Sequence, residues 1–590
     1  MKFYVVVMAT LLISVQASSY AQEDRESSRP EFSDMLEDYY QETLKLLPMY
    51  ATFIGDKRYN DLLHNDITPE HRARLKAHYT QYLDALGKYN KAELTEEERT
   101  SYDILQWQCE IELAELKYPR HLMPIDQLDS VNLLIGQFAG GASAQPFETK
   151  RDYDNWLNRV DVFVAWCDTA IVNMRKGMEQ GLVLPKALTK KVIPQLASWK
   201  EGPAENHHFY SPVKKLPKSI GEKEASEIRV SYREMIEGKL IPVINRLLDF
   251  VQNEYLPASR DTSGFSALPK GEEWYQHQIK YFTTTDLTAD DVFELGKSEV
   301  GRLKSEMETV KEKVGFKGDL KAFFDHVRQK PELMPFDDPQ QVIDNFNAIH
   351  ERMKPNLEKL FDLKPKTAFE VRRTEAFREA SASPEYNPGS MDGTRPGIFY
   401  VPIPHVESYH VGRDEVVFLH EAIPGHHYQV SLTLENEEFP AFRSITWNSA
   451  YAEGWAFYCE SLGEELGLYN DPYQYFGMVR MEMHRAIRLV VDPGLHAKGW
   501  TREQAIQYSL ENEAESEANV ISEIERYMAI PGQALSYKIG QLKIRELRNG
   551  AEEKLGGKFD IREFHNKVLE SGCVPLKVLE DKIDRWIRNS

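Results

Sequence analysis

The hydrophobic pattern of the chain is helical over most of its length. Apolar residues recur at spacings of three and four, which places them on one face of an α-helix. The segment 68–88 begins with a capping Thr68 followed by Pro69 at the first helical position. Similar patterns predict helices at about residues 95–116, 222–253, 286–314, 338–361, 411–436, 446–466, 472–491, 501–529 and 558–587.

Strand patterns are confined to two short segments, Ala368–Arg373 and Gly397–Val401. A stretch rich in Pro, Gly and Ser, residues 381–396, predicts a loop just before the second segment. We therefore expect a mainly α fold with at most a small β-sheet near residues 370–400. The strand at 397–401 is a hypothetical edge to which an extended peptide could pair.

Composition narrows the class of protein. Hydrophobic residues make up 42% of the 590 residues, enough for a packed core. The 93 Asp and Glu residues against 72 Lys and Arg give a net charge of −21, which argues against a nucleic-acid partner. The four cysteines cannot form a disulfide scaffold. Buried free thiols are expected, although one disulfide stays open.

The N-terminus has the pattern of a secretory signal. Lys2 precedes an apolar run, Phe3–Val15, and small residues precede a charged stretch that begins near residue 22. The alternative is an uncleaved anchor, but the run is shorter than the roughly 20 residues needed to cross a bilayer. No Cys lies near the cleavage point, so no lipoprotein signal is expected. We expect residues 1–21 to be removed, leaving a periplasmic or secreted protein without a membrane partner. The sequence does not predict the oligomeric state.

The richest chemistry lies in residues 415–429, which read EVVFLHEAIPGHHYQ. A His-Glu pair followed by a second His is typical of a zinc hydrolase helix, in which the imidazoles bind the metal and the Glu takes a proton from water. His420 and Glu421 form that pair, and His426 or His427 is the second ligand. The alternative is a capped helix end with surface histidines.

The spacing differs from the usual His-Glu-x-x-His. Residues six or seven apart on a straight helix are either on different faces or about 10 Å apart along the axis. Pro424 cannot donate a backbone hydrogen bond to the carbonyl of His420, and with Gly425 it favours a kink or bulge. A two-residue bulge would bring His426 to the position of the second ligand.

A third ligand is expected on the next helix. Glu453 lies among Ala, Gly and aromatic residues, where an unpaired carboxylate is costly, so a bound cation explains it well. The alternative is an ordinary surface Glu. Glu460, seven residues further on, is a reserve ligand or a group that supports the ligands.

Two later clusters contain groups that could stabilise an oxyanion. His496 follows an expected helix break after residue 491, and Tyr527 and Tyr537 flank a Pro-Gly turn. Tyr537 is assigned a catalytic role together with His496, and Tyr527 with Arg526 is assigned to substrate binding. The alternative for each is a buried aromatic or capping residue. Two further arginines, at positions 485 and 488, could equally form structural ion pairs.

Four motifs in order resemble the bacterial domain-of-unknown-function 885 family: HEAIPGHHYQ, EGWAFYCE, RLVVDPGLH and RYMAIPGQALSYKIG. The resemblance covers nearly the whole chain after residue 21. It implies distant similarity to helical metallopeptidases of the thimet oligopeptidase and carboxypeptidase Taq type. It also implies a two-lobed, mainly α fold with a deep cleft and one zinc ion held by His420, His426 and Glu453. The N-terminal region 22–280 would wall the cleft, and residues 281–590 would carry the metal site, as one integrated unit.

The sequence as a whole predicts an exported zinc metallopeptidase that hydrolyses short peptides, with Glu421 as the general base. Two alternatives stay open. One is a zinc hydrolase of a non-peptide amide or ester bond. The other is a non-catalytic protein that keeps the fold and binds peptides. The acidic composition could favour cationic peptides, although it is more often a solubility feature.

Overall fold

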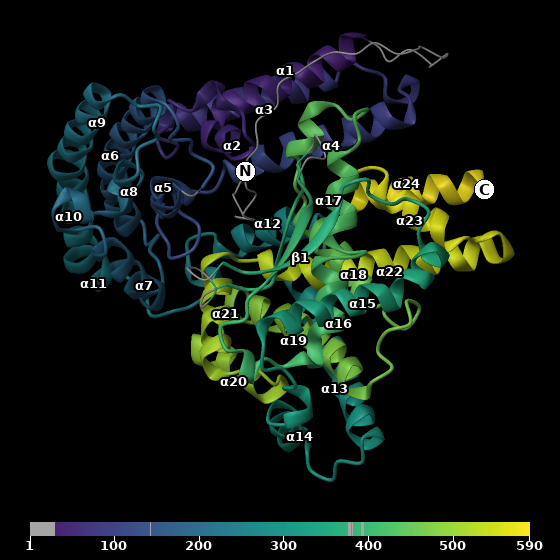
Figure 1. The fold of residues 1–590 in the computed structure, drawn as a ribbon. Coiled ribbons are helices and arrows are strands. Elements are labelled where there is room, and N and C mark those ends of the chain that lie inside the picture. The colour runs from purple at the N-terminus through teal and green to yellow at the C-terminus, as the bar shows by residue number, and fades with distance from the viewer. Residues whose placement is uncertain (1–29, 142, 376–378, 380–381, 391–394) are drawn as a thin grey trace. The chain divides into compact units, whose positions relative to one another are not determined.

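A computed structural model describes residues 30–590 except 142, 376–378, 380–381 and 391–394. In this structure, several of the expected helices start with a side-chain cap. Thr68 Oγ1 accepts a hydrogen bond from the backbone N–H of His71, and Thr288 makes a reciprocal capping box with Asp291. Helices joined by short loops follow one another along the described chain (Figure 1). This confirms the mainly α fold.

The chain divides into two compact units. Unit 1 contains residues 30–93, 105–271 and 528–530, and unit 2 contains residues 94–104, 272–527 and 531–590. The sequence-based ranges 22–280 and 281–590, their integration and the deep cleft stay predictions.

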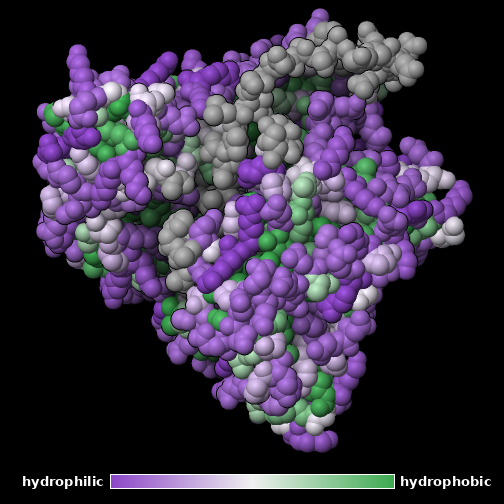
Figure 2. All heavy atoms as spheres, viewed as in Figure 1, coloured by the Kyte–Doolittle hydropathy of each residue, from purple (hydrophilic) through white to green (hydrophobic). Residues whose placement is uncertain are grey.

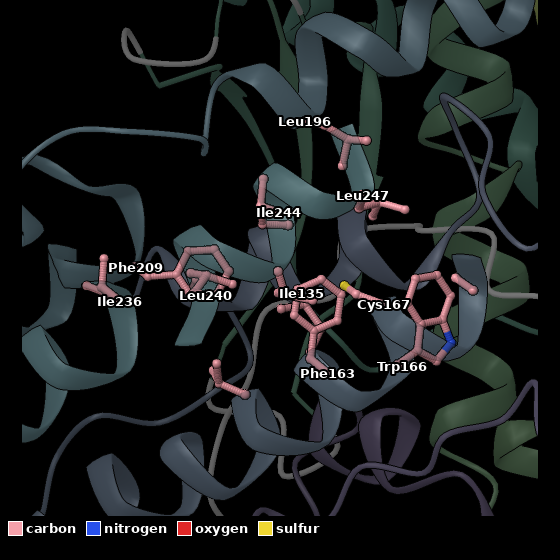
Figure 3. Packing of buried hydrophobic residues seen from close by; sticks show 14 of the residues in the cluster. Ile135, Phe163, Trp166, Cys167, Leu196, Phe209, Ile236, Leu240, Ile244 and Leu247 are labelled. Atoms are coloured by element: carbon pink, nitrogen blue, oxygen red, sulfur yellow. The ribbon is translucent and has the colours of Figure 1, made fainter. Parts of the chain in front are cut away.

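Unit 1 is built from helices around an aromatic and aliphatic core. Trp156, Phe163 and Cys167 lie on one face of the longest helix, α6, and are fully buried. Figure 3 shows Phe163, Trp166 and Cys167 among aliphatic side chains of neighbouring helices. The α-helices with most of their residues in unit 1 are α1 (Pro30–Leu46), α2 (Pro48–Phe53), α3 (Pro69–Leu86), α4 (Glu96–Glu115), α5 (Val131–Ala139), α6 (Lys150–Glu179), α7 (Lys186–Ala197), α8 (Ser211–Lys214), α9 (Glu222–Met235), α10 (Ile241–Phe250) and α11 (Leu256–Ala258).

Unit 2 contains the remaining α-helices and every candidate site residue. Its α-helices are α12 (Gly271–Thr283), α13 (Ala289–Lys313), α14 (Leu320–Arg328), α15 (Pro339–Leu360), α16 (Asp414–Glu421), α17 (His426–Leu434), α18 (Ser449–Glu460), α19 (Pro472–His496), α20 (Arg502–Asn512), α21 (Glu517–Ala529), α22 (Ser536–Leu555), α23 (Ile561–Leu569) and α24 (Leu576–Asn589).

A small three-stranded sheet lies in unit 2, as expected from its two predicted strands. Its strands are β1 (Phe369–Arg373), β2 (Glu385–Asn387) and β3 (Gly397–Val401), in the order β1-β3-β2. β3 pairs in parallel with β1 and antiparallel with β2. The idea that β3 is a free edge for a peptide is therefore wrong, because both of its edges are already paired.

Three predicted long helices are interrupted. The segment 411–436 separates into α16 and α17, 501–529 into α20 and α21, and 558–587 into α23 and α24. The sequence also missed β2, which lies in the stretch expected to be a loop. In contrast, α19 continues through Pro493 to His496, where we expected a break. Its last turns are completely buried, and this packing offsets the hydrogen bond that proline cannot donate.

The surface, the N-terminal segment and the cysteines complete the description of the fold. Hydrophilic residues cover most of the face shown in Figure 2. Among the residues that the structure describes, no helix has the length and apolar character to cross a membrane. The expected signal segment, residues 1–21, lies outside the described residues. All four cysteines are buried and free, as the sequence favoured.

Candidate metal centre

Helix α16 carries His420 and Glu421 at its C-terminal end. Its start is anchored by two acidic residues: Asp414 accepts hydrogen bonds from Tyr409 and Asn345, and Glu415 accepts one from Arg352 at 2.6 Å. The residues from Asp414 to His420 are all buried. The helix is therefore fixed on all sides before it reaches the His-Glu pair.

The chain between α16 and α17 is a break, where the sequence predicted a bulge. A Cβ on Gly425 would lie only 2.0 Å from the carbonyl oxygen of His420, so only glycine permits this close approach. The indole N–H of Trp455, on α18, donates to the carbonyl of Pro424 at 3.0 Å. The break starts a new helix at His426 and turns that side chain back toward His420.

Three side chains converge in this region. One donor atom each from His420, His426 and Glu453 lies within 4.8 Å of the others. Glu453 Oε2 is 3.6 Å from Nε2 of His420 and 3.6 Å from Nε2 of His426. Ligands of a tetrahedral zinc ion, bound at roughly 2.0–2.2 Å, lie about 3.4 Å apart. The donor set and its spacing therefore fit zinc.

Glu460 orients the ring of His420. Its Oε1 lies 2.7 Å from Nδ1 of His420, so this nitrogen donates to the carboxylate and Nε2 faces Glu453. Burial lowers the pKa of His420, but hydrogen bonds to Glu453 and Glu460 outweigh it and raise the pKa to about 10, so a cation that binds Nε2 would displace a proton. Of the two roles that the sequence left open for Glu460, the geometry favours support of a ligand.

Electrostatics distinguish the other two carboxylates. Burial would raise the pKa of Glu453, but the imidazoles of His420 and His426 hold it well below its usual range. This carboxylate stays charged. Glu421 is half-buried, and burial raises its pKa above the ordinary value for a glutamate. Two carboxylates in one site thus differ in basicity, as a ligand and a proton acceptor should.

A glycine contact brings Tyr537 close to the three converging side chains. A Cβ on Gly540 of α22 would lie 1.8 Å from the carbonyl oxygen of Ala450, and one on Gly454 of α18 would lie 2.5 Å from Gly540 Cα. The two helices therefore touch through their backbones, side by side in Figure 1. Burial raises the pKa of Tyr537, and the negative charge of Glu453 raises it further.

His427 points elsewhere. Its Nδ1 lies 2.9 Å from the hydroxyl of Tyr386 and 3.3 Å from that of Ser431. Burial lowers the pKa of His427 to about 4. Between the two histidines that the sequence left open, the structure brings His426 to His420 and Glu453. Tyr386 lies in the unexpected strand β2, and no sequence pattern pointed to it.

His496 is placed in the core. It is completely buried, its ring stacks on Tyr275 at 5.1 Å, and its Nε2 lies 3.0 Å from the carbonyl oxygen of Tyr527. These contacts favour a structural role for His496 over the oxyanion role expected from the sequence. The expected break before His496 would have exposed it, but α19 continues and keeps it inside.

The proposed substrate-binding pair belongs to an ionic network. Arg526 Nε and Nη2 donate to the two carboxylate oxygens of Glu523, both at 3.0 Å. The hydroxyl of Tyr527 donates to Glu523 at 2.7 Å and accepts from Arg488 at 3.0 Å. Tyr527 is 2% exposed, so its role in substrate contact stays a prediction without direct support from the geometry.

Comparison with models of protein families identifies the family of the chain. A family model described as "Bacterial protein of unknown function (DUF885)" matches residues 48–583. The chain belongs to the DUF885 family. The match includes every residue of the candidate metal centre. Comparison with curated proteins gives no match.

Two solved structures share the fold of this DUF885 protein. One, described as "the putative lipoprotein from Colwellia psychrerythraea", is 27% identical with a TM-score of 0.85, over 95% of this chain and 99% of that one. A second, from Shewanella oneidensis and described as "a putative lipoprotein of unknown function", is 19% identical with a TM-score of 0.75, over 93% and 99%. A "putative oligoendopeptidase F" from Bacillus anthracis is 12% identical over 87% of this chain and 96% of that one, with a TM-score of only 0.26.

Proposed function

We propose that this DUF885 protein is an exported zinc-dependent peptidase that hydrolyses short peptides. The observation that carries the proposal is the convergence of His420, His426 and Glu453, with Glu421 next to His420 in the chain. Two imidazoles and one carboxylate leave a fourth position open, which is typical of catalytic zinc sites and not of structural ones. When bound there, zinc supplies Lewis acidity toward a carbonyl oxygen and toward water.

Glu421 is the general base of the proposed reaction. It takes a proton from the attacking water and later passes it to the amine that leaves. Its raised pKa suits this task, because a carboxylate is a stronger base when its pKa is closer to the working pH. Glu453 remains ionised and serves as a ligand, since its pKa is held low.

Tyr537 is proposed to donate a hydrogen bond to the oxyanion. The raised pKa keeps its phenol protonated at neutral pH, so the hydroxyl can act as a donor. The ring is fixed from one side by Arg488, whose guanidinium carbon lies 4.6 Å from the ring centroid. Tyr537 is half-buried, as expected for a group that meets both protein and substrate.

Export is the remaining part of the proposal. It rests on the apolar run and small residues near the N-terminus, and it is supported by the lipoprotein descriptions of two similar structures. We therefore propose export to the periplasm or the medium.

A peptide-library digestion read by mass spectrometry tests the activity. Wild-type protein should produce defined cleavage products, and Glu421→Gln should lose roughly 100- to 10,000-fold in kcat while it keeps its metal. A non-catalytic binding protein would release no products from either form. If only esters or non-peptide amides were hydrolysed, the peptidase proposal would fail and a zinc hydrolase of another bond would replace it.

A further inference from the structure

Arg485, on α19, is a buried cation that forms no ion pair with a carboxylate of the described residues. It is 8% exposed, and its hydrogen bonds run from Nη1 to the carbonyl oxygen and the sulfur of Met481, both at 3.3 Å. Its Nε is buried without a hydrogen bond. A guanidinium in such a place is costly unless an anion balances it. The guanidinium of Arg485 can therefore accept an anion from outside the protein.

Nearby arginines show that pairing is otherwise the rule. Arg480, on the same helix, pairs with Glu515 at 3.2 Å, and Arg526 pairs with Glu523 through two hydrogen bonds. Arg488 also pairs with Glu523, at 3.0 Å, but its Nη1 is buried without a hydrogen bond. One carboxylate, that of Glu523, thus pairs with both Arg488 and Arg526. Arg485 and Arg488 have more N–H donors than the surrounding residues have acceptors for them.

The unpaired donors lie beside the candidate metal centre. The guanidinium of Arg485 lies 5.5 Å from the ring centroid of Phe457 and 6.0 Å from that of Tyr537. Phe457 is one helical turn after Glu453 on α18, so both side chains lie on the same face of that helix. The positive charge of Arg485 also acts on Glu421, where it partly offsets the rise in pKa that burial causes. The cation therefore faces the site in which the substrate would be cleaved.

We propose that Arg485, together with Nη1 of Arg488, binds the C-terminal carboxylate of the substrate, so that the protein is a carboxypeptidase. A planar guanidinium offers parallel N–H donors that match a carboxylate. The C-terminal carboxylate is the charged group that unmodified peptides share, and a carboxypeptidase must bind it near the scissile bond. The inference rests on the proposed peptidase function and specifies which end of the substrate the protein recognises.

Three peptides of matched length test the proposal. They are acetyl-tetraalanine as the free acid, acetyl-tetraalanine amide, and succinyl-tetraalanine amide, which carries its carboxylate at the wrong end. Wild-type protein should hydrolyse the free acid with a kcat/KM roughly 10- to 100-fold above both amides, the range expected for loss of a charge-assisted hydrogen bond. The difference should lie mainly in KM, because the carboxylate is bound before and during the reaction.

Arg485→Met should reduce hydrolysis of the free acid to the level of the amides. No carboxylate of the described residues forms an ion pair with Arg485, so the protein should fold. Loss of the positive charge raises the pKa of Glu421 for all three peptides alike, so the ratio of acid to amide hydrolysis is the readout. Arg485→Lys should restore part of the preference for the acid. Arg480→Met, on the same helix, is the matched control and should keep the wild-type ratio, since Arg480 is paired with Glu515.

Calorimetry gives a second readout that does not need turnover. The Glu421→Gln protein should bind the free acid more tightly than either amide, and this preference should disappear when Arg485→Met is added. Equal cleavage of the acid and the amides by wild type, or an unchanged ratio in Arg485→Met, overturns the carboxylate site and leaves the peptidase proposal standing. If no peptide is cleaved, the proposed function and the carboxypeptidase assignment both fail.

Discussion

Glu460 acts on the candidate metal centre through His420. Because it accepts the Nδ1 proton of His420, it fixes both the orientation of the ring and the tautomer that can bind a cation. The sequence offered this role only as one of two, since a Glu seven residues after Glu453 could also be a ligand. The choice depends on the distance between two helices, which sequence patterns do not give.

Glu460→Gln should weaken zinc binding roughly 10- to 100-fold, because an amide holds and polarises the imidazole less than a carboxylate does. Competition with a chelator of known affinity measures the effect. Glu464→Gln is the matched control, since Glu464 is exposed four residues further along the chain. An unchanged affinity in Glu460→Gln would show that the carboxylate does not support the ligand.

Asp492 is a buried carboxyl group that makes the stability of the protein depend on pH. It is completely buried, and burial raises its pKa to about 7 from 3.8, although Tyr275 and Gly532 donate hydrogen bonds to it. The folded state therefore holds a proton that the unfolded state releases between pH 3.8 and 7. The free energy of unfolding should fall as the pH rises through this window.

Asp492→Asn removes this dependence. The variant should gain stability relative to wild type by up to about 1.4 kcal/mol per pH unit across the window. Urea midpoints at pH 5 and pH 8 measure the difference, which should be larger at pH 8. A constant difference between the two pH values would mean that Asp492 does not hold a proton in the folded state.

At the scale of elements, the site depends on two backbone approaches that only glycine allows. Gly425 lets the chain leave α16 and start α17 against the carbonyl of His420, and Gly540 lets α22 approach α18. Helix starts such as those at Thr68 and Thr288 could be predicted because their signals are local. The break at Gly425 could be predicted only as a kink or bulge, because its direction depends on contacts with Trp455 of another helix. The identity of His426 as the converging residue follows from that direction.

Gly540→Ala should destabilise unit 2 by about 1–3 kcal/mol, because the added methyl group would meet the carbonyl of Ala450. Gly550→Ala on the same helix is the matched control. A Cβ there meets no atom within 4 Å, so the helix should gain about 0.5–1 kcal/mol. Urea unfolding of both variants measures the contrast. Equal stabilities would contradict the close contact between α18 and α22.

At the scale of the whole chain, all candidate ligands belong to unit 2. The sequence predicted the mainly α class well, because helical spacing is repeated in many segments. The net charge of −21 argues against a nucleic-acid partner but did not select a substrate. The proposed carboxylate site rests on Arg485 having no ion pair with the described carboxylates, and this could not be predicted from the sequence. Whether an arginine has a partner depends on which helices meet, and the sequence contains many acidic residues that could have paired with it.

Zinc should stabilise unit 2 and leave unit 1 unchanged. A ligand that binds only the folded state, at a free concentration of roughly 1,000 times its Kd, raises the free energy of unfolding by about 4 kcal/mol. Hydrogen exchange with and without a chelator measures this effect by segment, and slower exchange is expected in α16, α17 and α18 when zinc is present. A uniform change over both units would contradict a site built only from unit 2.

The metal content of the purified protein tests the central claim most directly. Elemental analysis of wild type should find about one zinc per chain, and His426→Ala should lose it, whereas His427→Ala should retain it, because His427 is held by Tyr386 and Ser431 away from the cluster. The absence of a stoichiometric transition metal in the wild-type protein would contradict the account.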